Sequence, residues 1–334
     1  MKSKLIKILL WTLPIIVGLI SIGVGRYQID FVVQIKILLS QIVPMEQTWT
    51  NMEETVVMNV RLPRILLAML IGGGLSIAGA AFQGMFANPL VSPDILGVSA
   101  GAGFGASIGI LLFGNSFTMQ IMALVMGMLA IGFTFLIGGV KRDMPIFMLV
   151  LAGVVTSALF QALISLVKFL ADPEEKLPAI TYWLMGSLGT ASYSDLMIGG
   201  PIILVGILIL YVLRWRLNIL SLSEEEALSL GVSVNKLKWL VILGATLITA
   251  AAVSIAGIIG WVGLIIPHIA RMIVGSNNQY VLPASISIGA VYLLFIDNLA
   301  RSLTAAEIPL SILTAIIGAP FFAYLLRKTG GGWN

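Results

Sequence analysis

The sequence contains no cysteine and only one histidine, His268. The lack of cysteine excludes disulfides, thiol chemistry and cysteine-based metal sites, and a single histidine without a carboxylate cluster does not make a metal cage. Charged residues are also scarce, at 10% of the 334 residues, against about 25% in soluble domains. Because 59% of the residues are hydrophobic, no soluble fold could bury the apolar surface. We therefore predict an all-α integral membrane protein with no metal or cofactor of its own.

Two further features are missing. The net charge of +4 is spread over the whole chain, and without a basic stripe we expect no binding to nucleic acid. The phosphate-binding loop G-x-x-x-x-G-K-[ST] does not occur, so this chain does not itself cradle the phosphates of ATP. We predict no catalytic residues.

What the sequence does contain is a series of apolar runs near 20 residues, each long enough to cross roughly 30 Å of hydrocarbon. They recur from end to end, so we predict that residues 1–334 form one polytopic domain. A further apolar stretch, Phe31–Val43, is interrupted by Lys36 and is interpreted as re-entrant or interfacial. We predict ten spans, at about Leu5–Gly25, Leu62–Gly84, Ile95–Phe113, Phe117–Gly138, Pro145–Val167, Tyr193–Leu213, Leu237–Ile259, Trp261–Val274, Tyr280–Leu299 and Glu307–Leu326.

The basic residues orient these spans. Lys2, Lys4 and Lys7 precede the first span, and no A-x-A-like cleavage site follows Gly25, so we predict an uncleaved first helix. Placing both termini in the cytoplasm leaves most basic residues inside and most acidic residues outside, in agreement with the positive-inside rule.

Glycine recurs every fourth residue in the third span, at Gly97, Gly101, Gly105 and Gly109. Residues at this spacing share one helix face, and faces of small residues let membrane helices approach closely. Two roles are open for this face, namely tight packing inside the subunit and the lining of a moving pathway.

The longest predicted cytoplasmic connection, residues 221–233, has the pattern of a short capped helix. Ser223 and Glu226 have the spacing of a capping box, and Gly231 suits the left-handed position after the last turn. Its apolar residues are too few to form a core, so the segment is either a solvated loop or a helix that docks on a partner. The residues concerned are Ser223, Glu224, Glu225, Glu226, Ala227, Leu230 and Gly231.

Four stretches resemble the FecCD-type permeases of ABC importers, which take up iron-siderophores, haem and cobalamin. They are RLPRILLAML…GAAFQGMFANPLVSPDILG, EEALSLGV, GIIGWVGLIIPHIAR and DNLAR…EIPLSILTAIIGAPFF. Together they extend over nearly the whole chain. The resemblance implies a subunit of about ten transmembrane helices in the bacterial cytoplasmic membrane, with both termini in the cytoplasm.

The resemblance also implies the partners of the chain. They are a second permease subunit, identical or paralogous, two ATPase subunits that hold ATP and Mg²⁺, and a soluble extracytoplasmic substrate-binding protein. The helix within residues 221–233 is expected to sit in a cleft of the ATPase and to couple the two subunits.

Two arginines, Arg61 and Arg64, flank Pro63 at the predicted outer mouth of the second span, where long cationic side chains reach the interface at little cost. In the family, arginines of this motif and the arginine that ends the D-x-x-A-R motif, here Arg301, face acidic residues of the binding protein. The resemblance therefore implies that the three arginines dock that protein; interfacial anchoring is the alternative. Asp297 lies four residues before Arg301 and predicts a local helix pair.

The outer segment 168–192 begins with too many polar residues to span. In the family this part forms a short helix near the mouth, and the W-x-M-G-S motif matches Trp183, Met185, Gly186 and Ser187. Pathway lining and simple packing are both open for this motif.

The function implied by the resemblance is translocation of an iron-siderophore by ATP-driven alternating access, with haem, cobalamin or an oxyanion as alternative cargo. A rival of another class is an ion-coupled secondary transporter, which normally needs acidic or histidine groups near the bilayer midplane. Almost every charge here falls at a span end. We therefore predict a transport subunit and not an enzyme.

Overall fold

The computed structural model describes residues 4–138, 146–221 and 224–329, and in these residues it contains helices and no strands. The α-helices are α1 (Lys4–Gly23), α2 (Phe31–Ser40), α3 (Asn51–Thr55), α4 (Leu62–Met85), α5 (Val98–Leu112), α6 (Ser116–Gly138), α7 (Ile146–Leu170), α8 (Lys176–Leu184), α9 (Tyr193–Leu213), α10 (Glu224–Ser229), α11 (Val234–Ala256), α12 (Val262–Val274), α13 (Asn278–Ser302) and α14 (Leu310–Thr329). A π-helix, η1 (Val56–Arg61), and two 3₁₀-helices, η2 (Pro93–Leu96) and η3 (Arg216–Ser221), complete the list.

Each predicted span overlaps one of these helices, and the predicted Tyr193–Leu213 coincides with α9. The structure shows six helices that are long and apolar enough to cross a membrane within the described residues. α12, for example, has 13 residues and is therefore about 20 Å long, which is shorter than the hydrocarbon layer. A multi-span helical protein is confirmed, and the count of ten spans and their orientation stay predictions.

α4 and α11 form the centre of the bundle. The most apolar 18-residue windows of their helices are 83% and 78% buried, against 28% in α6. α4 packs against α13, α11, α12 and α9, and small residues permit this. A methyl group added to Gly72 would lie 2.3 Å from the carbonyl oxygen of Gly289 in α13. Such a short separation between backbones is how membrane helices gain van der Waals contact.

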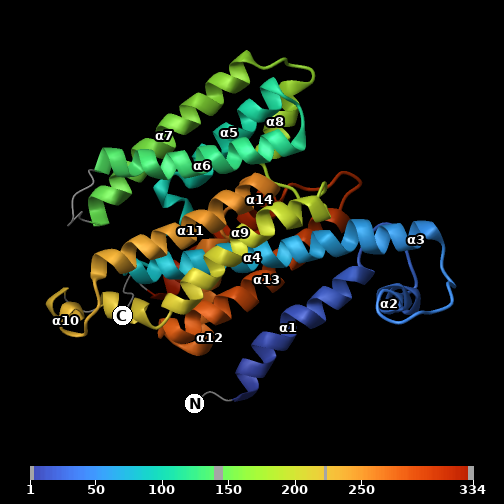
Figure 1. Cartoon of the computed structure of the whole chain (residues 1–334), viewed down its shortest axis with the longest axis horizontal. Coiled ribbons are helices and arrows are strands. Elements are labelled where there is room, and N and C mark those ends of the chain that lie inside the picture. The colour runs from blue at the N-terminus through green and yellow to red at the C-terminus, as the bar shows by residue number, and fades with distance from the viewer. Residues whose placement is uncertain (1–3, 139–145, 222–223, 330–334) are drawn as a thin grey trace.

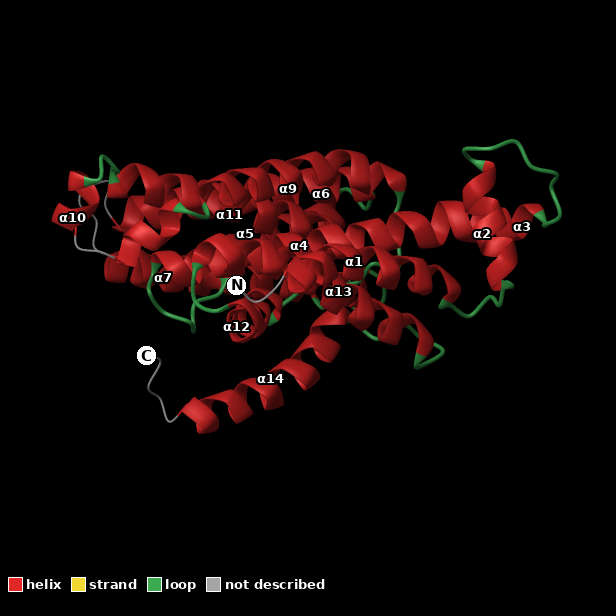
Figure 2. Cartoon of the chain, turned by 90° about the horizontal axis from the view of Figure 1, so that it is seen from below, coloured by secondary structure: helices red, strands yellow, loops and turns green. Residues whose placement is uncertain are grey.

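The other helices form layers on either side of this centre. In Figure 1, α5, α6, α7 and α8 form the upper layer, α4, α9 and α11 the middle, and α1, α12 and α13 the lower one. α14 belongs to none of these layers and stands apart from the rest of the bundle (Figure 2). Its residues Ile316 and Tyr324 are 63% and 59% exposed.

The helix that contains the second predicted span begins before that span. α4 starts at Leu62, as the span does, and proline is typical of a first helical turn, but α3, η1 and α4 form one continuous helix, Asn51–Met85. Proline lacks the N–H that an α-helix needs in its interior, and its ring crowds the preceding turn. The wider π-turn of η1 directly precedes Pro63, and the amide of Leu62 bonds to the carbonyl of Val57. This wider turn accommodates the proline and carries the helix on past it.

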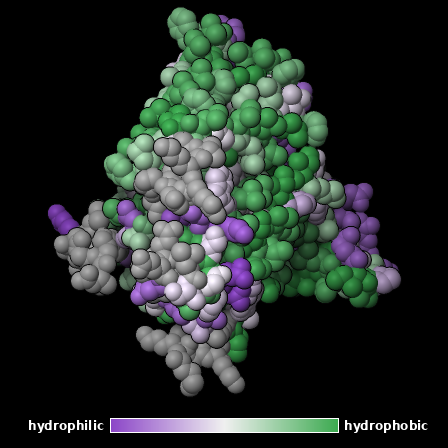
Figure 3. Space-filling view, turned by 60° about the vertical axis from the view of Figure 1, so that its left-hand side comes forward, coloured by the Kyte–Doolittle hydropathy of each residue, from purple (hydrophilic) through white to green (hydrophobic). Residues whose placement is uncertain are grey.

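Different segments occupy the two ends of the bundle. α2 and α3 project at one end and α10 lies at the other, and α2 is seen end on, so it crosses the bundle axis (Figure 1). The ten residues of α2 are too few to span, and the re-entrant or interfacial placement of Phe31–Val43 stays a prediction. Figure 3, which brings the α10 end forward, shows hydrophilic residues gathered at that end and hydrophobic residues over the flanks.

Candidate functional site

The first candidate site is a buried charge cluster where α4, α13 and the connection to α14 meet. Arg64, in the first turn of α4, donates to both oxygens of Asp297 over 2.8–3.0 Å and to both oxygens of Glu307 at 2.8 and 2.9 Å. The Asp297 side chain is fully buried and that of Glu307 is 28% exposed. A buried charge is tolerated when it is paired and hydrogen-bonded, so this cluster joins α4 to the C-terminal part of the chain, more than 230 residues away.

The other two arginines bind the end of α1. Arg61 donates to the carbonyl oxygen of Ile22 at 2.7 Å and to that of Tyr27. Arg301 donates to the carbonyl oxygen of Ser21 at 2.8 Å. Cationic side chains are favourable at a helix C-terminus, where carbonyl groups lack partners within the helix. Arg61 and Arg301 therefore cap α1 and fix it against α4 and α13.

The side chains of the three arginines are buried inside the subunit. Arg61, Arg64 and Arg301 are only 3%, 5% and 6% exposed, and their guanidinium groups bind partners inside the subunit. The structure does bring the three together, and the predicted Asp297–Arg301 pair is present at 3.7 Å. A direct role in docking stays a prediction, and the geometry favours an indirect one in which the arginines hold the outer ends of the helices in place.

Sequence reasoning missed the main partner of Arg64. Asp297 lies 233 residues away in the chain, so no local spacing reveals the pair. A usable signal was present, because Asp297 and Glu307 are isolated acids in an apolar C-terminal region. Such acids need a cationic partner.

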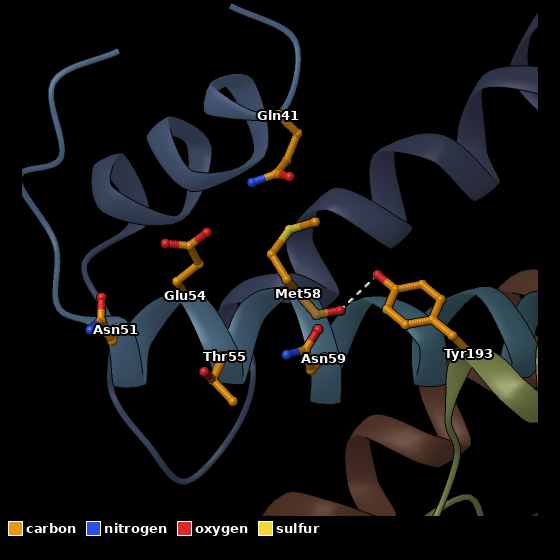
Figure 4. Close-up of a pocket in the computed structure, with 7 residues that line it drawn as sticks. All are labelled: Gln41, Asn51, Glu54, Thr55, Met58, Asn59 and Tyr193. Carbon is orange, nitrogen blue, oxygen red and sulfur yellow. Dashed lines mark hydrogen bonds between the residues drawn. The ribbon is translucent and has the colours of Figure 1, made fainter. Parts of the chain in front are cut away.

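The second candidate site is a polar cavity beside η1, at the end of the bundle where α2 and α3 project (Figure 4). Its volume is about 470 Å³. Tyr193, at the start of α9, donates its hydroxyl hydrogen to the carbonyl oxygen of Met58 at 2.7 Å, and Trp49 donates to Glu54 at 3.0 Å. The lining residues are Gln41, Asn51, Glu54, Thr55, Met58, Asn59 and Tyr193.

The W-x-M-G-S motif forms a junction between helices. Gly186 has a φ of +76°, which glycine adopts without strain, and its carbonyl oxygen accepts from the amide of Leu310 at 2.9 Å. Met185 accepts from Ser311 at 3.2 Å, and Ser187 donates to Ala256 at 2.9 Å. These bonds tie the end of α8 to the end of α11 and the start of α14.

Two residues of the motif also line a cavity. Trp183 and Ser187 line a second cavity of about 640 Å³, together with Gln120 and Asp195. Gln120 donates to Asp195 at 2.5 Å. The motif therefore both packs and lines a cavity within the predicted outer segment 168–192.

The glycine face of α5 is a packing surface. A methyl group on Gly101 would lie 2.4 Å from Cβ of Ala130, and one on Gly105 would lie 2.2 Å from the carbonyl oxygen of Met122. Gly109 meets α6 in the same way, while Gly97, at φ +82°, turns the chain into α5 beside α7. Of the two open roles, the structure shows packing inside the subunit.

The third candidate site is α10, at the opposite end of the bundle. Its C-terminus has the predicted left-handed glycine, Gly231 at φ +71°, and the amide of Val232 bonds to the carbonyl oxygen of Ala227 at 3.1 Å. This pattern is a Schellman motif. Ala227 is fully buried, whereas Leu230 is 61% exposed, so the helix presents an apolar side chain to its surroundings.

Part of the predicted cap cannot be placed. Ser223 lies outside the described residues, as do the side chains of Glu224 and Glu225, while Glu226 is exposed. His268 is 9% exposed within α12. No group of three or more metal-ligating side chains occurs among the residues that the structure describes.

Comparisons with known proteins agree on one family. A family model described as the FecCD transport family matches residues 13–328. The chain is 44% identical over 328 residues to a molybdate import system permease protein of Haemophilus influenzae, covering 96% of this chain and 95% of that protein. It is 40% identical over 276 residues to a probable iron chelatin transport system permease protein of Helicobacter pylori, covering 83% of each.

A solved structure is also similar. It is described as an inward-facing conformation of a metal-chelate type ABC transporter, and the match has a TM-score of 0.85 at 43% sequence identity. It covers 96% of this chain and 99% of the solved one.

Proposed function

The chain belongs to the FecCD transport family, and on this premise we propose that it is the permease subunit of a binding-protein-dependent ABC importer. Proteins of this family are transport subunits and not enzymes, because separate ATPase subunits hydrolyse the ATP. We place the subunit in the bacterial cytoplasmic membrane as a multi-pass protein with both termini in the cytoplasm. ATP-driven alternating access then carries the cargo through it.

The observation that carries this proposal is the exposed, Schellman-capped α10. A short helix that presents Leu230 at 61% exposure gains stability when a partner surface covers that side chain. We infer that the segment from Ser223 to Gly231 docks in a cleft of an ATPase subunit. Two ATPase subunits then move two such helices, and their ATP and Mg²⁺ remain outside this chain.

A second permease subunit is the next partner we propose. α14 stands apart from the bundle (Figure 2), and α7 exposes Phe147 and Val154 at 69% and 55%. We place a second copy or a paralogue against this side and lipid against the other apolar flanks. The cavity beside Trp183 and Ser187 then belongs to the outer mouth of the pathway.

Two classes of cargo have support from the relatives. The match to the molybdate permease extends over almost the full length of both chains, which favours an oxyanion such as molybdate. The match to the iron chelatin permease favours an iron chelate such as a siderophore complex. Haem and cobalamin are further cargoes of permeases matched at 35% and 41% identity. We propose the oxyanion first and the iron-siderophore second.

An ion-coupled secondary transporter is a poorer fit to the structure. Such a transporter normally needs acidic groups near the bilayer midplane. Asp297 is buried, but it lies in the last two turns of α13 and pairs with Arg64 in the first turn of α4. The pair therefore lies near one end of the bundle, where it holds α4 against α13.

Uptake by intact cells tests the proposed function. Cells that express the importer are given labelled molybdate or a labelled iron-siderophore, and an uncoupler is added while ATP is maintained. We expect uptake to continue under the uncoupler and to stop with vanadate, and the ATPase subunit to co-purify with the chain. Uptake that collapses under the uncoupler would instead show an ion-coupled transporter.

A further inference from the structure

The connection between α9 and α11 contains a segment that is held firmly in the bundle. η3 (Arg216–Ser221) lies just before α10 in the chain, and its residues Leu217 and Ile219 are buried. After α10 the chain is held less firmly, because Gly231 and Ser233 are exposed and Ser233 makes no side-chain cap bond to α11. η3 is therefore the firmer of the two attachments of α10.

Asn218, in the middle of η3, binds the start of α13 with both the nitrogen and the oxygen of its side-chain amide. Its Nδ2 donates to Oδ1 of Asn277 at 2.9 Å, and its Oδ1 accepts from the backbone amide of Asn278 at 2.9 Å. These two bonds join residues that are 59 and 60 positions apart in the sequence. We call Asn218, Asn277 and Asn278 the Asn218 clamp.

The Asn218 clamp completes the cap of α13 from another segment. Amides in the first turn of a helix have no partner within that helix. Asn277 is the N-cap of α13, and its side chain accepts from the amide of Gln279 at 2.9 Å. The amide of Asn278 is served by Asn218 instead. Because Asn278 is only 7% exposed, loss of Asn218 would leave this amide with little access to another acceptor, which is costly.

The far end of α13 carries the buried charge cluster. α13 has 25 residues and is therefore about 38 Å long. Asp297, near its last turns, pairs with Arg64 of α4, and Arg301 donates to a carbonyl oxygen at the end of α1. α13 is thus fixed to η3 at one end and to α4 and α1 at the other, and α10 lies at the η3 end of the bundle (Figure 1). Rigid helices joined by such contacts carry coupling between distant sites.

We propose that Asn218 is a positioning residue for transport, because the Asn218 clamp makes α13 follow the movement of α10. This inference rests on the proposed function, in which the ATPase subunits move α10. Asn218 acts through α13 and has no contact of its own with cargo or nucleotide. Without the clamp, ATP hydrolysis continues on the ATPase subunits while less of the movement reaches the other end of α13.

The test uses proteoliposomes that contain the complete assembly of the chain, its ATPase subunits and the binding protein. Uptake of labelled molybdate, or of a labelled iron-siderophore, is measured together with ATP hydrolysis. We expect Asn218→Ala to lower the uptake per ATP hydrolysed at least about fivefold, whereas basal ATP hydrolysis and co-purification of the ATPase subunit change little. Asp30→Ala is the matched control, because the Asp30 side chain also caps a helix, α2, but bonds locally to the amide of Val32. It should leave the uptake per ATP unchanged.

Two conservative variants separate the clamp from the stability of the chain. Asn277→Asp keeps the oxygen that accepts from Asn218 and Gln279, so the uptake per ATP should stay close to that of the unmodified chain. Asn218→Asp keeps the oxygen that accepts from Asn278, and a negative charge is favourable at a helix N-terminus, so the thermal midpoint should hold. Aspartate cannot donate to Asn277, so the uptake per ATP should still fall.

The outcomes separate this inference from the proposed function. If the unmodified assembly accumulates neither probe, the proposed function fails. If it accumulates one, the inference about Asn218 fails and the function stands when Asn218→Ala lowers uptake and hydrolysis in proportion, lowers neither, or acts no more strongly than Asp30→Ala. Loss of the ATPase subunit from Asn218→Ala would show that Asn218 only supports α10 and would also overturn the inference. Full coupling in Asn218→Asp, or lost coupling in Asn277→Asp, would contradict the clamp in the same way.

Discussion

The buried ion pair of Arg64 and Asp297 allows a quantitative test of the fold. Replacing Arg64 by methionine leaves the fully buried carboxylate of Asp297 with only Arg301, whose Nε lies 3.7 Å away. Removing one partner of a buried pair costs roughly 3–5 kcal/mol, because the other charge stays buried without compensation. Asp297→Leu should cost less, because Arg64 keeps its two hydrogen bonds to Glu307.

The double variant Arg64→Met/Asp297→Leu separates pairing from other effects. With both charges gone, no uncompensated partner remains between the two residues, so the double variant should lose less than the sum of the single variants. A difference of roughly 1–3 kcal/mol is expected for groups in direct contact. Glu307→Gln is the matched control, because the Glu307 side chain is 28% exposed and its pair should contribute about 1 kcal/mol or less.

The measurement is the free energy of unfolding from an equilibrium SDS titration in mixed micelles, read by helix content and by tryptophan fluorescence. Losses that add within about 0.5 kcal/mol would refute the pairing. A negligible loss in Arg64→Met would refute the burial of the pair.

Three further predictions concern the glycine face of α5, the exposed Leu230 and the carboxylate of Glu307. Gly105→Ala places a methyl group 2.2 Å from the carbonyl oxygen of Met122 and should cost roughly 1–3 kcal/mol of stability. Gly132→Ala is the control, because its methyl group would have nothing within 4 Å, and it should be neutral or stabilising. Equal effects of the two variants on stability would contradict the packing role of the α5 glycines. Leu230→Ser should reduce the amount of ATPase subunit that co-purifies without changing the thermal midpoint of the chain, and undiminished co-purification would argue against docking through α10. Hydrogen bonding to Arg64 lowers the pKa of Glu307 in the folded protein. The ionised carboxylate therefore stabilises the fold at pH values above its unfolded pKa of about 4.3, and this stabilisation is lost as the pH falls through the lower, folded pKa. Glu307→Gln should therefore show a shallower loss of stability on acidification, and an unchanged slope would contradict the ion pair.

The sequence predicted the helices well because hydrophobic length is a local property. An apolar run such as Tyr193–Leu213 forms a helix in lipid, because its backbone N–H and C=O groups must pair with one another. Local rules also predicted Gly231, because a left-handed residue after a helix favours glycine. The four-residue glycine spacing in α5 predicted a smooth face but left its role open, and the contacts with α6 were needed to identify packing.

Properties that depend on distant contacts were not predictable in this way. Arg64 and Asp297 meet only because α4 and α13 pack side by side, so the sequence could place Arg64 at an end of a span but not inside a cluster. Pro63 gives a second example of a feature whose outcome depends on distant contacts. It normally marks a first turn, yet the preceding π-turn lets the helix continue, and the choice between the two depends on the tertiary packing of η1.

We propose that ATPase subunits, docked on the cytoplasmic side, open and close the pathway through this chain. The most direct measurement is uptake of labelled cargo by proteoliposomes that contain the chain alone, the chain with its ATPase subunits, or the complete assembly with the binding protein. We predict ATP-dependent accumulation only in the complete assembly. Accumulation by the chain alone, without a nucleotide-hydrolysing subunit, would contradict the account.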